Sequence, residues 1–258
     1  PAAASADADA AEAFAWLCPS VRPLLRNSDE ARVLRILEHD SLEWQFDGLL
    51  ELERLTGGNA LVAIGWALFE RHGIVRALRI DASTLCNFLR ALSEGYNDVP
   101  YHCSAHAACV AHGLHYLLAV RTELFQLWRG EPPELVAPPF AALVHDLGHT
   151  GQNNAFHVAT SSELALRYSD QSVLEYHHLA SAWSILGKSE CALLKNAEPD
   201  FKRRMRQEVV GMVLATDLAV SIGTINQFKA MLADQGAAAA AAFSPDLKRK
   251  SRAVHFNA

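Results

Sequence analysis

The chain has 258 residues, of which 50% are hydrophobic and 20% charged, and its formal net charge is -6. This composition is typical of a globular protein with a sizeable core. The acidic balance argues against a nucleic-acid-binding surface, which would need a basic face. We expect the two basic runs, Lys202–Arg206 and Lys248–Arg252, to be solvated surface instead.

Cysteine usage and hydropathy predict an intracellular, cytoplasmic location. The five cysteines are an odd number without a Cys-x-x-Cys pair, which favours reduced thiols over disulfides. The longest apolar run, Ala60–Phe69, is about half of what a membrane span needs, so we expect no membrane segment. The chain begins at Pro1 rather than at methionine, which predicts a fragment of a longer protein. Its oligomeric state is left open.

The first half of the chain predicts a linker followed by helices. Residues 1–27, rich in alanine and aspartate, are expected to form a flexible linker. The pattern then becomes helical, and residues 28–258 are expected to form one domain. The predicted helices span residues 28–37, 49–55, 60–70, 81–92 and 101–128.

The second half begins with two proline pairs, Pro132–Pro133 and Pro138–Pro139, which predict a loop. A helix carrying His145 and His149 should follow and end near Gly148 and Gly151. Further helices are expected from Ser161, over 172–186 and within 200–233, before an alanine-rich loop at 236–242. No convincing period-2 alternation is present, so the predicted class is all-α.

Histidines cluster in the middle of the chain. Nine of the twelve lie between His102 and His178. Two pairs have a four-residue spacing that would place both members on one helix face, namely His102 with His106 and His145 with His149. Glu175 and His178, three apart, should share another. We interpret His112, His115 and His157, each taken singly, as core histidines.

The His145–Asp146 pair, at the end of a buried apolar run, predicts a metal site. Both groups need partners once buried, and imidazole with carboxylate suits zinc, magnesium or manganese. Such an ion makes bound water a nucleophile near neutral pH, and a second ion sharing Asp146 would suit displacement at phosphorus. His102 is placed to protonate a leaving oxygen, with Glu175 accepting its other N–H.

Four segments resemble the class I cyclic nucleotide phosphodiesterase catalytic domain. The stretch 101–110 is similar to the family's Tyr-His-Asn-x-x-His-Ala-x-Asp-Val helix. The stretch 145–156 contains every fixed position of His-Asp-x-x-His-x-Gly-x-x-Asn-x-Phe, and the resemblance continues through 162–179 and 213–217. It covers roughly residues 30–232 and implies a compact multi-helix bundle of the histidine–aspartate (HD) superfamily.

The resemblance also implies roles for individual residues. His102 becomes the general acid, assisted by Glu175. His106, His145 and Asp146 become metal ligands, with Asp146 shared between two divalent ions, zinc and magnesium (or manganese). The groups implied to lie around the metals or the substrate are Tyr101, His149, Asn154, His178 and Asp217.

The chain departs from the family pattern in two places. Cys103 and Cys109 replace an asparagine and an aspartate, which removes hydrogen-bonding capacity without removing a ligand. No match is found for a later metal-ligand aspartate or for the glutamine that grips the purine, so we expect both beyond residue 258. From spacing alone, Asp217 on an apolar helix would be the candidate for the last ligand.

The leading hypothesis is hydrolysis of a 3′,5′-cyclic nucleotide, cAMP or cGMP, to the 5′-monophosphate. One alternative is a broader HD-type nucleotide phosphohydrolase. Another is a non-catalytic nucleotide-binding or scaffolding domain. The sequence does not indicate which base is preferred.

Overall fold

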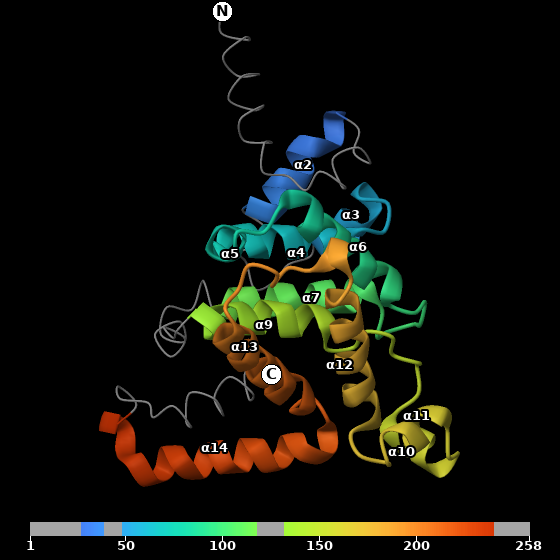
Figure 1. Ribbon diagram of the computed structural model, residues 1–258, viewed down its shortest axis with the longest axis vertical. Helices are drawn as coiled ribbons and strands as arrows, with labels where there is room; N and C mark the ends of the chain where they lie inside the picture. The colour runs from blue at the N-terminus through green and yellow to red at the C-terminus, as the bar shows by residue number, and fades with distance from the viewer. Residues whose placement is uncertain (1–26, 39–47, 118–131, 240–258) are drawn as a thin grey trace, which may run out of the picture.

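The computed structural model describes residues 27–38, 48–117 and 132–239, all of them in helices or connecting turns and loops. These residues contain no strand, which confirms the all-α prediction (Figure 1). The expected linker lies outside them except for Asn27, as do the alanine-rich residues from 240 and the second basic run. The helices are α2 (Asn27–Glu38), α3 (Gly48–Leu55), α4 (Ala60–Arg71), α5 (Ile74–Leu78), α6 (Ala82–Gly95), α7 (Ser104–His115), α9 (Pro132–Val144), α10 (Asn154–Ala159), α11 (Glu163–Arg167), α12 (Val173–Leu186), α13 (Pro199–Leu214) and α14 (Leu218–Ala239), with a 3₁₀ turn, η5 (Ser189–Cys191).

Helices α4, α7 and α9 form the centre of the fold. α4 is apolar around its whole circumference, as expected of a helix buried on all sides. It packs against α6 and α7, while α9 packs against α7 and α13. In α9, Phe140 is fully buried and stacks on Phe88 of α6 and Trp183 of α12. The stacked rings join three helices around the segment that leads into His145.

The prediction of a loop at the two proline pairs is wrong, because α9 runs continuously from Pro132 to Val144. Pro132 stands at the first position, where a missing N–H costs nothing. Pro138 and Pro139 lie inside the helix, where each removes a backbone hydrogen bond. The segment from Val136 to Val144 is buried. We infer that tertiary burial of this apolar surface outweighs the local cost.

Two helix boundaries near the histidines also differ from the prediction. The helix expected over 101–128 begins at Ser104, so His102 precedes it and does not share a helix face with His106. Residues 118–128 lie outside the described part of the chain. Helix α9 ends at Val144, before Gly148 and Gly151, so His145 and His149 lie in the following turn and loop. Their proximity to other histidines is therefore decided by tertiary packing.

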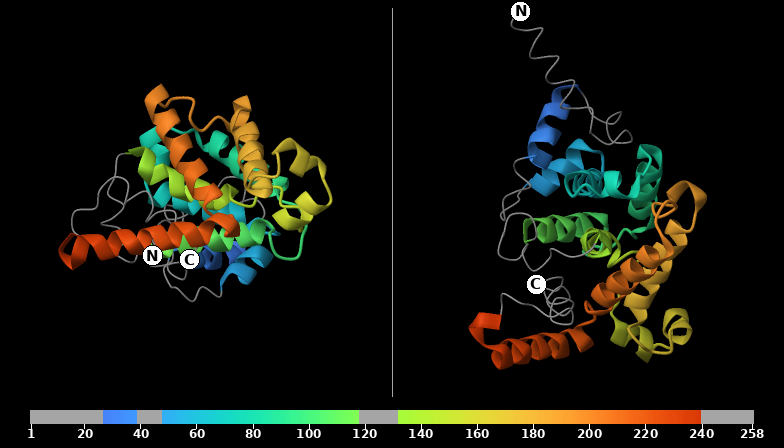
Figure 2. Two further views of the ribbon diagram at one scale, coloured as in Figure 1. Left: turned by 90° about the horizontal axis from the view of Figure 1, so that it is seen from below. Right: turned by 60° about the vertical axis from the view of Figure 1, so that its left-hand side comes forward.

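Asp217 occupies the junction of α13 and α14 rather than an apolar helix. α14 continues through Ala239, so residues 236–239 of the predicted alanine loop are helical. The helix extends away from the helices around α4 (Figures 1 and 2). No single described helix is long and apolar enough to cross a membrane. The pair Pro199–Leu214 and Leu218–Gln227, bent by 106°, meets the length and hydropathy criteria only when taken together.

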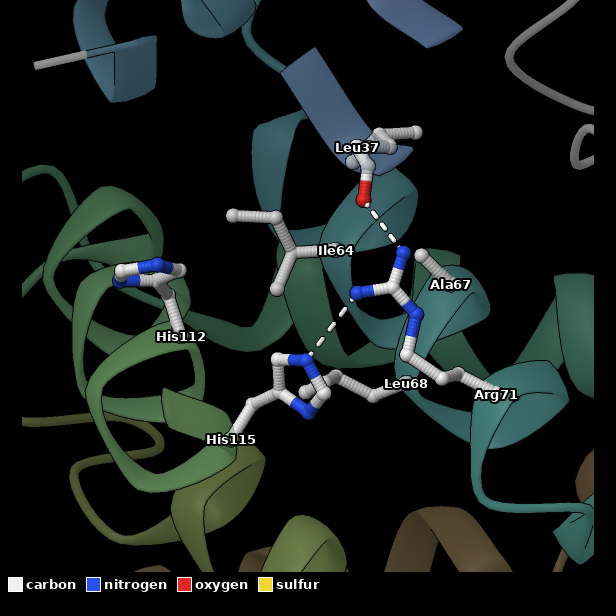
Figure 3. A pocket seen from close by; sticks show the side chains of 7 residues that line it. All are labelled: Leu37, Ile64, Ala67, Leu68, Arg71, His112 and His115. Atoms are coloured by element: carbon white, nitrogen blue, oxygen red, sulfur yellow. Dashed lines mark hydrogen bonds between the residues drawn. The ribbon is translucent and has the colours of Figure 1, made fainter. Parts of the chain in front are cut away.

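A partly buried chain of hydrogen bonds ties α2, α4 and α7 together next to a small apolar pocket (Figure 3). Arg71 donates to the Leu37 carbonyl oxygen at 2.9 Å and to Nε2 of His115 at 3.1 Å. Nδ1 of His115 lies 3.1 Å from Nε2 of His72. Since arginine only donates, a neutral His115 accepts on Nε2 and donates from Nδ1 to His72. His115 is thus a hydrogen-bonded core histidine, as the sequence predicted.

Candidate metal centre

Three of the predicted ligands converge from two elements. His145 and Asp146 occupy the turn after α9, and His106 lies on α7, which packs against α9. One oxygen of Asp146, Oδ2, is 3.1 Å from Nε2 of His145 and 3.4 Å from Nε2 of His106. The donor atoms of all three residues lie within 4.8 Å of one another. The tertiary structure therefore brings together the ligand set that the sequence indicated.

The hydrogen bonding of His145 suits a metal ligand. Its Nδ1 lies 3.0 Å from the carbonyl oxygen of Ala142, and a carbonyl can only accept, so Nδ1 carries the proton. In the neutral ring Nε2 then presents a lone pair to the Asp146 oxygen. Two electron-rich atoms at this distance need a proton or a cation between them. A divalent ion fits this donor set, and the Ala142 carbonyl supplies the outer contact that orients ligating histidines.

The charge state of Asp146 also favours a cation. Burial by itself raises the pKa of this carboxyl group. In the absence of an ion, His106 and His145 rings that carry a proton towards Asp146 outweigh burial, and the pKa falls well below its usual range. Asp146 is therefore ionised at every physiological pH. A buried carboxylate requires a compensating positive charge, which a bound ion provides.

A second group of possible ligands shares Asp146. It comprises Asp146, His149 and His178, all buried. His178 Nδ1 lies 2.8 Å from the Leu147 carbonyl oxygen, so Nε2 faces Oδ1 of Asp146 at 3.8 Å. Burial, only partly offset by Asp146, lowers the pKa of His178 to about 3. The ring is thus neutral, and its Nε2 lone pair is available to bind a metal ion.

His102 lies beside this centre and has no atom in either ligand group. Its ring stacks on His149, with centroids 3.9 Å apart and planes at 20°, and its centroid is 5.7 Å from that of His106. Burial lowers the pKa of His102, although Asp146 opposes the effect. Tyr101 is 64% exposed and its ring lies 4.5 Å from the His106 ring. The aromatic rings thus form a continuous wall beside the ligands.

Glu175 has a different partner from the one predicted. Its Oε2 accepts a hydrogen bond from Asn154 Nδ2 at 2.9 Å, and the described residues include no hydrogen bond between Glu175 and His102. Oδ1 of Asn154 accepts from the Leu174 amide at 2.9 Å, which fixes the amide orientation. Burial raises the pKa of Glu175, and the charges of Asp217 and Asp146 raise it further. The charges of Asp217 and Asp146 therefore both act on the Glu175 carboxyl group.

Asp217 joins the start of α12 to the start of α14. Its Oδ2 accepts from the Ser172 hydroxyl at 2.8 Å, and its Oδ1 accepts from the Ala219 amide at 2.9 Å. The second contact caps α14 at the bend. Ser172 adopts a left-handed conformation with φ of 36°. Asp217 thus supports the start of the helix that carries Glu175 and His178.

The loop that carries His149 depends on residues that sequence reasoning left out. Asn97, which lies between α6 and α7, donates to the carbonyl oxygens of Gly148 at 3.2 Å and His149 at 3.0 Å. Gly148 has φ of 75°, and a Cβ there would lie 3.0 Å from Nε2 of His177. Glycine is therefore required on both conformational and steric grounds. The polar Asn97 directly before the first histidine motif was the available signal.

The two cysteines that depart from the family pattern lie at the start and in the middle of α7. Cys103 is the N-cap residue of α7 in extended conformation and makes no side-chain capping bond. Cys109 is exposed. Neither thiol belongs to a group of possible metal ligands among the described residues. Both positions thus lack hydrogen-bonding side chains without changing the ligand set, as predicted.

A family profile described as 3′5′-cyclic nucleotide phosphodiesterase matches residues 101–255. The chain is 32% identical over 216 residues to the protein named 3′,5′-cyclic-AMP phosphodiesterase 4 of Dictyostelium discoideum. The aligned region covers 83% of this chain and 20% of that relative. The chain is 35% identical over 210 residues to the human protein named high affinity cAMP-specific and IBMX-insensitive 3′,5′-cyclic phosphodiesterase 8A, covering 81% of this chain and 25% of the relative.

The fold is also similar to a solved structure, the phosphodiesterase domain of the RhoPDE fusion protein from the choanoflagellate Salpingoeca rosetta. The TM-score is 0.73 at 29% sequence identity, and the similarity covers 87% of this chain and 68% of that one. By contrast, the chain spans 20% and 25% of the two curated relatives named above. The similarity therefore concerns the helical domain that holds the histidines.

Proposed function

Because this chain belongs to the 3′,5′-cyclic nucleotide phosphodiesterase family, we propose that it hydrolyses a 3′,5′-cyclic nucleotide to the 5′-monophosphate with the help of divalent metal ions. One observation carries the proposal. His106, His145 and Asp146 converge within 4.8 Å, with His102 beside them and outside the ligand group. Metal ligands next to an unligated imidazole are what phosphodiester hydrolysis requires.

His106, His145 and Asp146 would hold the first ion, for which zinc is our assignment from the imidazole ligands. Asp146 would also serve a second ion, magnesium or manganese, since its two oxygens face different histidines. The negative charges of Asp146 and Asp217, which both act on Glu175, favour a cation near these carboxyl groups. A bound divalent ion supplies hydroxide at neutral pH and neutralises charge on the phosphate.

His102 is proposed to protonate the departing 3′-oxygen. Hydrolysis of the cyclic diester breaks the bond from phosphorus to this oxygen, which leaves as an alkoxide unless it receives a proton. Histidine is the most frequent proton donor to such a group, because the pKa of an imidazole lies near neutral pH. Stacking on His149 holds the His102 ring beside the ligands without tying it to them. Glu175, held by Asn154, is proposed to assist catalysis.

The test separates proton donation from metal binding. His102→Ala in the full-length protein should retain its metal content while turnover of cAMP or cGMP falls by about a hundredfold or more, as expected for loss of a general acid. Metal is measured by elemental analysis and 5′-monophosphate by chromatography, with added magnesium or manganese. If the variant lost metal to the same extent as activity, His102 would not be the proton donor. Tight nucleotide binding without turnover by the native protein would favour the non-catalytic alternative.

A further inference from the structure

A hydrogen-bonded triad of Thr150, His157 and Ser162 lies next to the His149 loop. Nε2 of His157 is 2.8 Å from the Thr150 hydroxyl, and Nδ1 is 2.8 Å from the Ser162 hydroxyl. His157 is only 6% exposed, although it lies on the short helix α10 at the edge of the fold (Figure 1). A buried imidazole held at both nitrogens has a fixed ring orientation.

The two hydroxyl groups are anchored to different segments. Ser162 Oγ also accepts from the Ala165 amide and caps α11. Thr150 Oγ1 also accepts from the Gln152 amide at 3.4 Å, within the loop that follows His149. A neutral His157 donates to one hydroxyl and accepts from the other, so every polar atom is satisfied. The triad therefore connects the helical unit α10–α11 to the residue directly after His149.

The same loop sets the orientation of the His149 ring. The Gly151 amide donates to Nδ1 of His149 at 3.0 Å, and Asn97 holds the His149 carbonyl. Thr150 lies between these two anchors. The His149 ring then stacks on His102. Movement of Thr150 would consequently change the ring on which the proposed proton donor rests.

We propose that His157 is a positioning residue, which acts through Thr150 to hold His149 and thereby the ring of His102. This inference rests on the proposed function for the consequence in catalysis, but its structural part does not. The relevant contact is the one from Nε2 of His157 to Thr150. The contact from Nδ1 to Ser162 anchors the imidazole and supports α11, without touching the His149 loop.

Two substitutions separate the two contacts. His157→Gln places an amide near the Nε2 position and can keep the bond to Thr150, whereas His157→Asn places one near Nδ1 and can keep only the bond to Ser162. We expect H157N to lower kcat about tenfold or more with KM nearly unchanged, since small displacements of catalytic groups have effects of this size. H157Q should retain most of the native kcat. T150V should reproduce H157N, and the double variant should lose nothing further.

A spectroscopic readout keeps the structural part testable if the protein does not hydrolyse cyclic nucleotides. The ring protons of His102 carry a ring-current shift from the stacked His149, measurable by NMR in selectively labelled, metal-free protein. This shift should be native in H157Q and altered in H157N and T150V. A native shift in H157N or T150V would overturn the proposal, as would equal kcat losses in H157N and H157Q. Inactivity of the native protein would instead overturn the proposed function.

Discussion

Acid should unfold this protein partly through the His72–His115 pair, which the fold holds neutral. Burial, reinforced by the neighbouring charge of Arg71, lowers the pKa of His72 to about 4. Burial, followed by the effects of His72 and Arg71, lowers the pKa of His115 to about 3. Both values lie below the 6.5 of an unperturbed histidine. The unfolded chain therefore binds protons below pH 6.5 that the folded chain does not.

The sign and size of the effect follow from this difference. Above pH 6.5 both states are neutral at these positions, so the pair has no influence on the pH dependence. As pH falls from about 6.5 towards 4, each proton bound only by the unfolded state costs about 1.4 kcal/mol of stability per pH unit. Both rings are protonated in the unfolded chain and neutral in the folded chain over this range, so we expect the pair to account for about 4 kcal/mol lost by pH 5, about 2 kcal/mol for each ring.

The matched variant is His115→Gln, whose side-chain oxygen can still accept from Arg71. Urea unfolding of native protein and variant is followed between pH 7.5 and 5, in chelator so that metal does not contribute. The variant should lose less stability than the native protein, by about 1–2 kcal/mol over this range. Other buried histidines, such as His178, titrate equally in both proteins and cancel. Parallel stability curves would refute the reasoning.

Three further predictions concern the site. Asp146→Ala should remove bound metal, because it deletes the carboxylate common to both ligand groups; undiminished metal in elemental analysis would contradict this. Cys103→Asn should stabilise the protein by about 1 kcal/mol in urea unfolding, since it supplies the missing cap of α7, whereas the exposed control Cys109→Ser should have little effect. Gly148→Ala should cost about 1–2 kcal/mol because of its left-handed φ and should lower kcat; native stability and kcat would contradict the need for glycine at this position.

Several properties were determined by the sequence itself. The sequence lacks the period-2 alternation of half-buried strands. Its apolar residues instead follow the 3.6-residue period of helices that bury one face, so it predicted an all-helical chain. The His145–Asp146 pair, at the end of an apolar run, indicated a metal site, because buried imidazole and carboxylate groups need a charged partner. Such properties depend on residue type and local spacing, which the sequence states directly.

Other features were decided only by tertiary structure. The prolines of α9 would break an isolated helix, but burial against α7 and α13 keeps it continuous. His102 approaches His106 and His149 although it lies on no helix, because the preceding turn and the loop held by Asn97 meet there. His157 connects to Thr150 for a similar reason. These contacts join segments through packing and turn geometry, and helical periodicity carries no information about either.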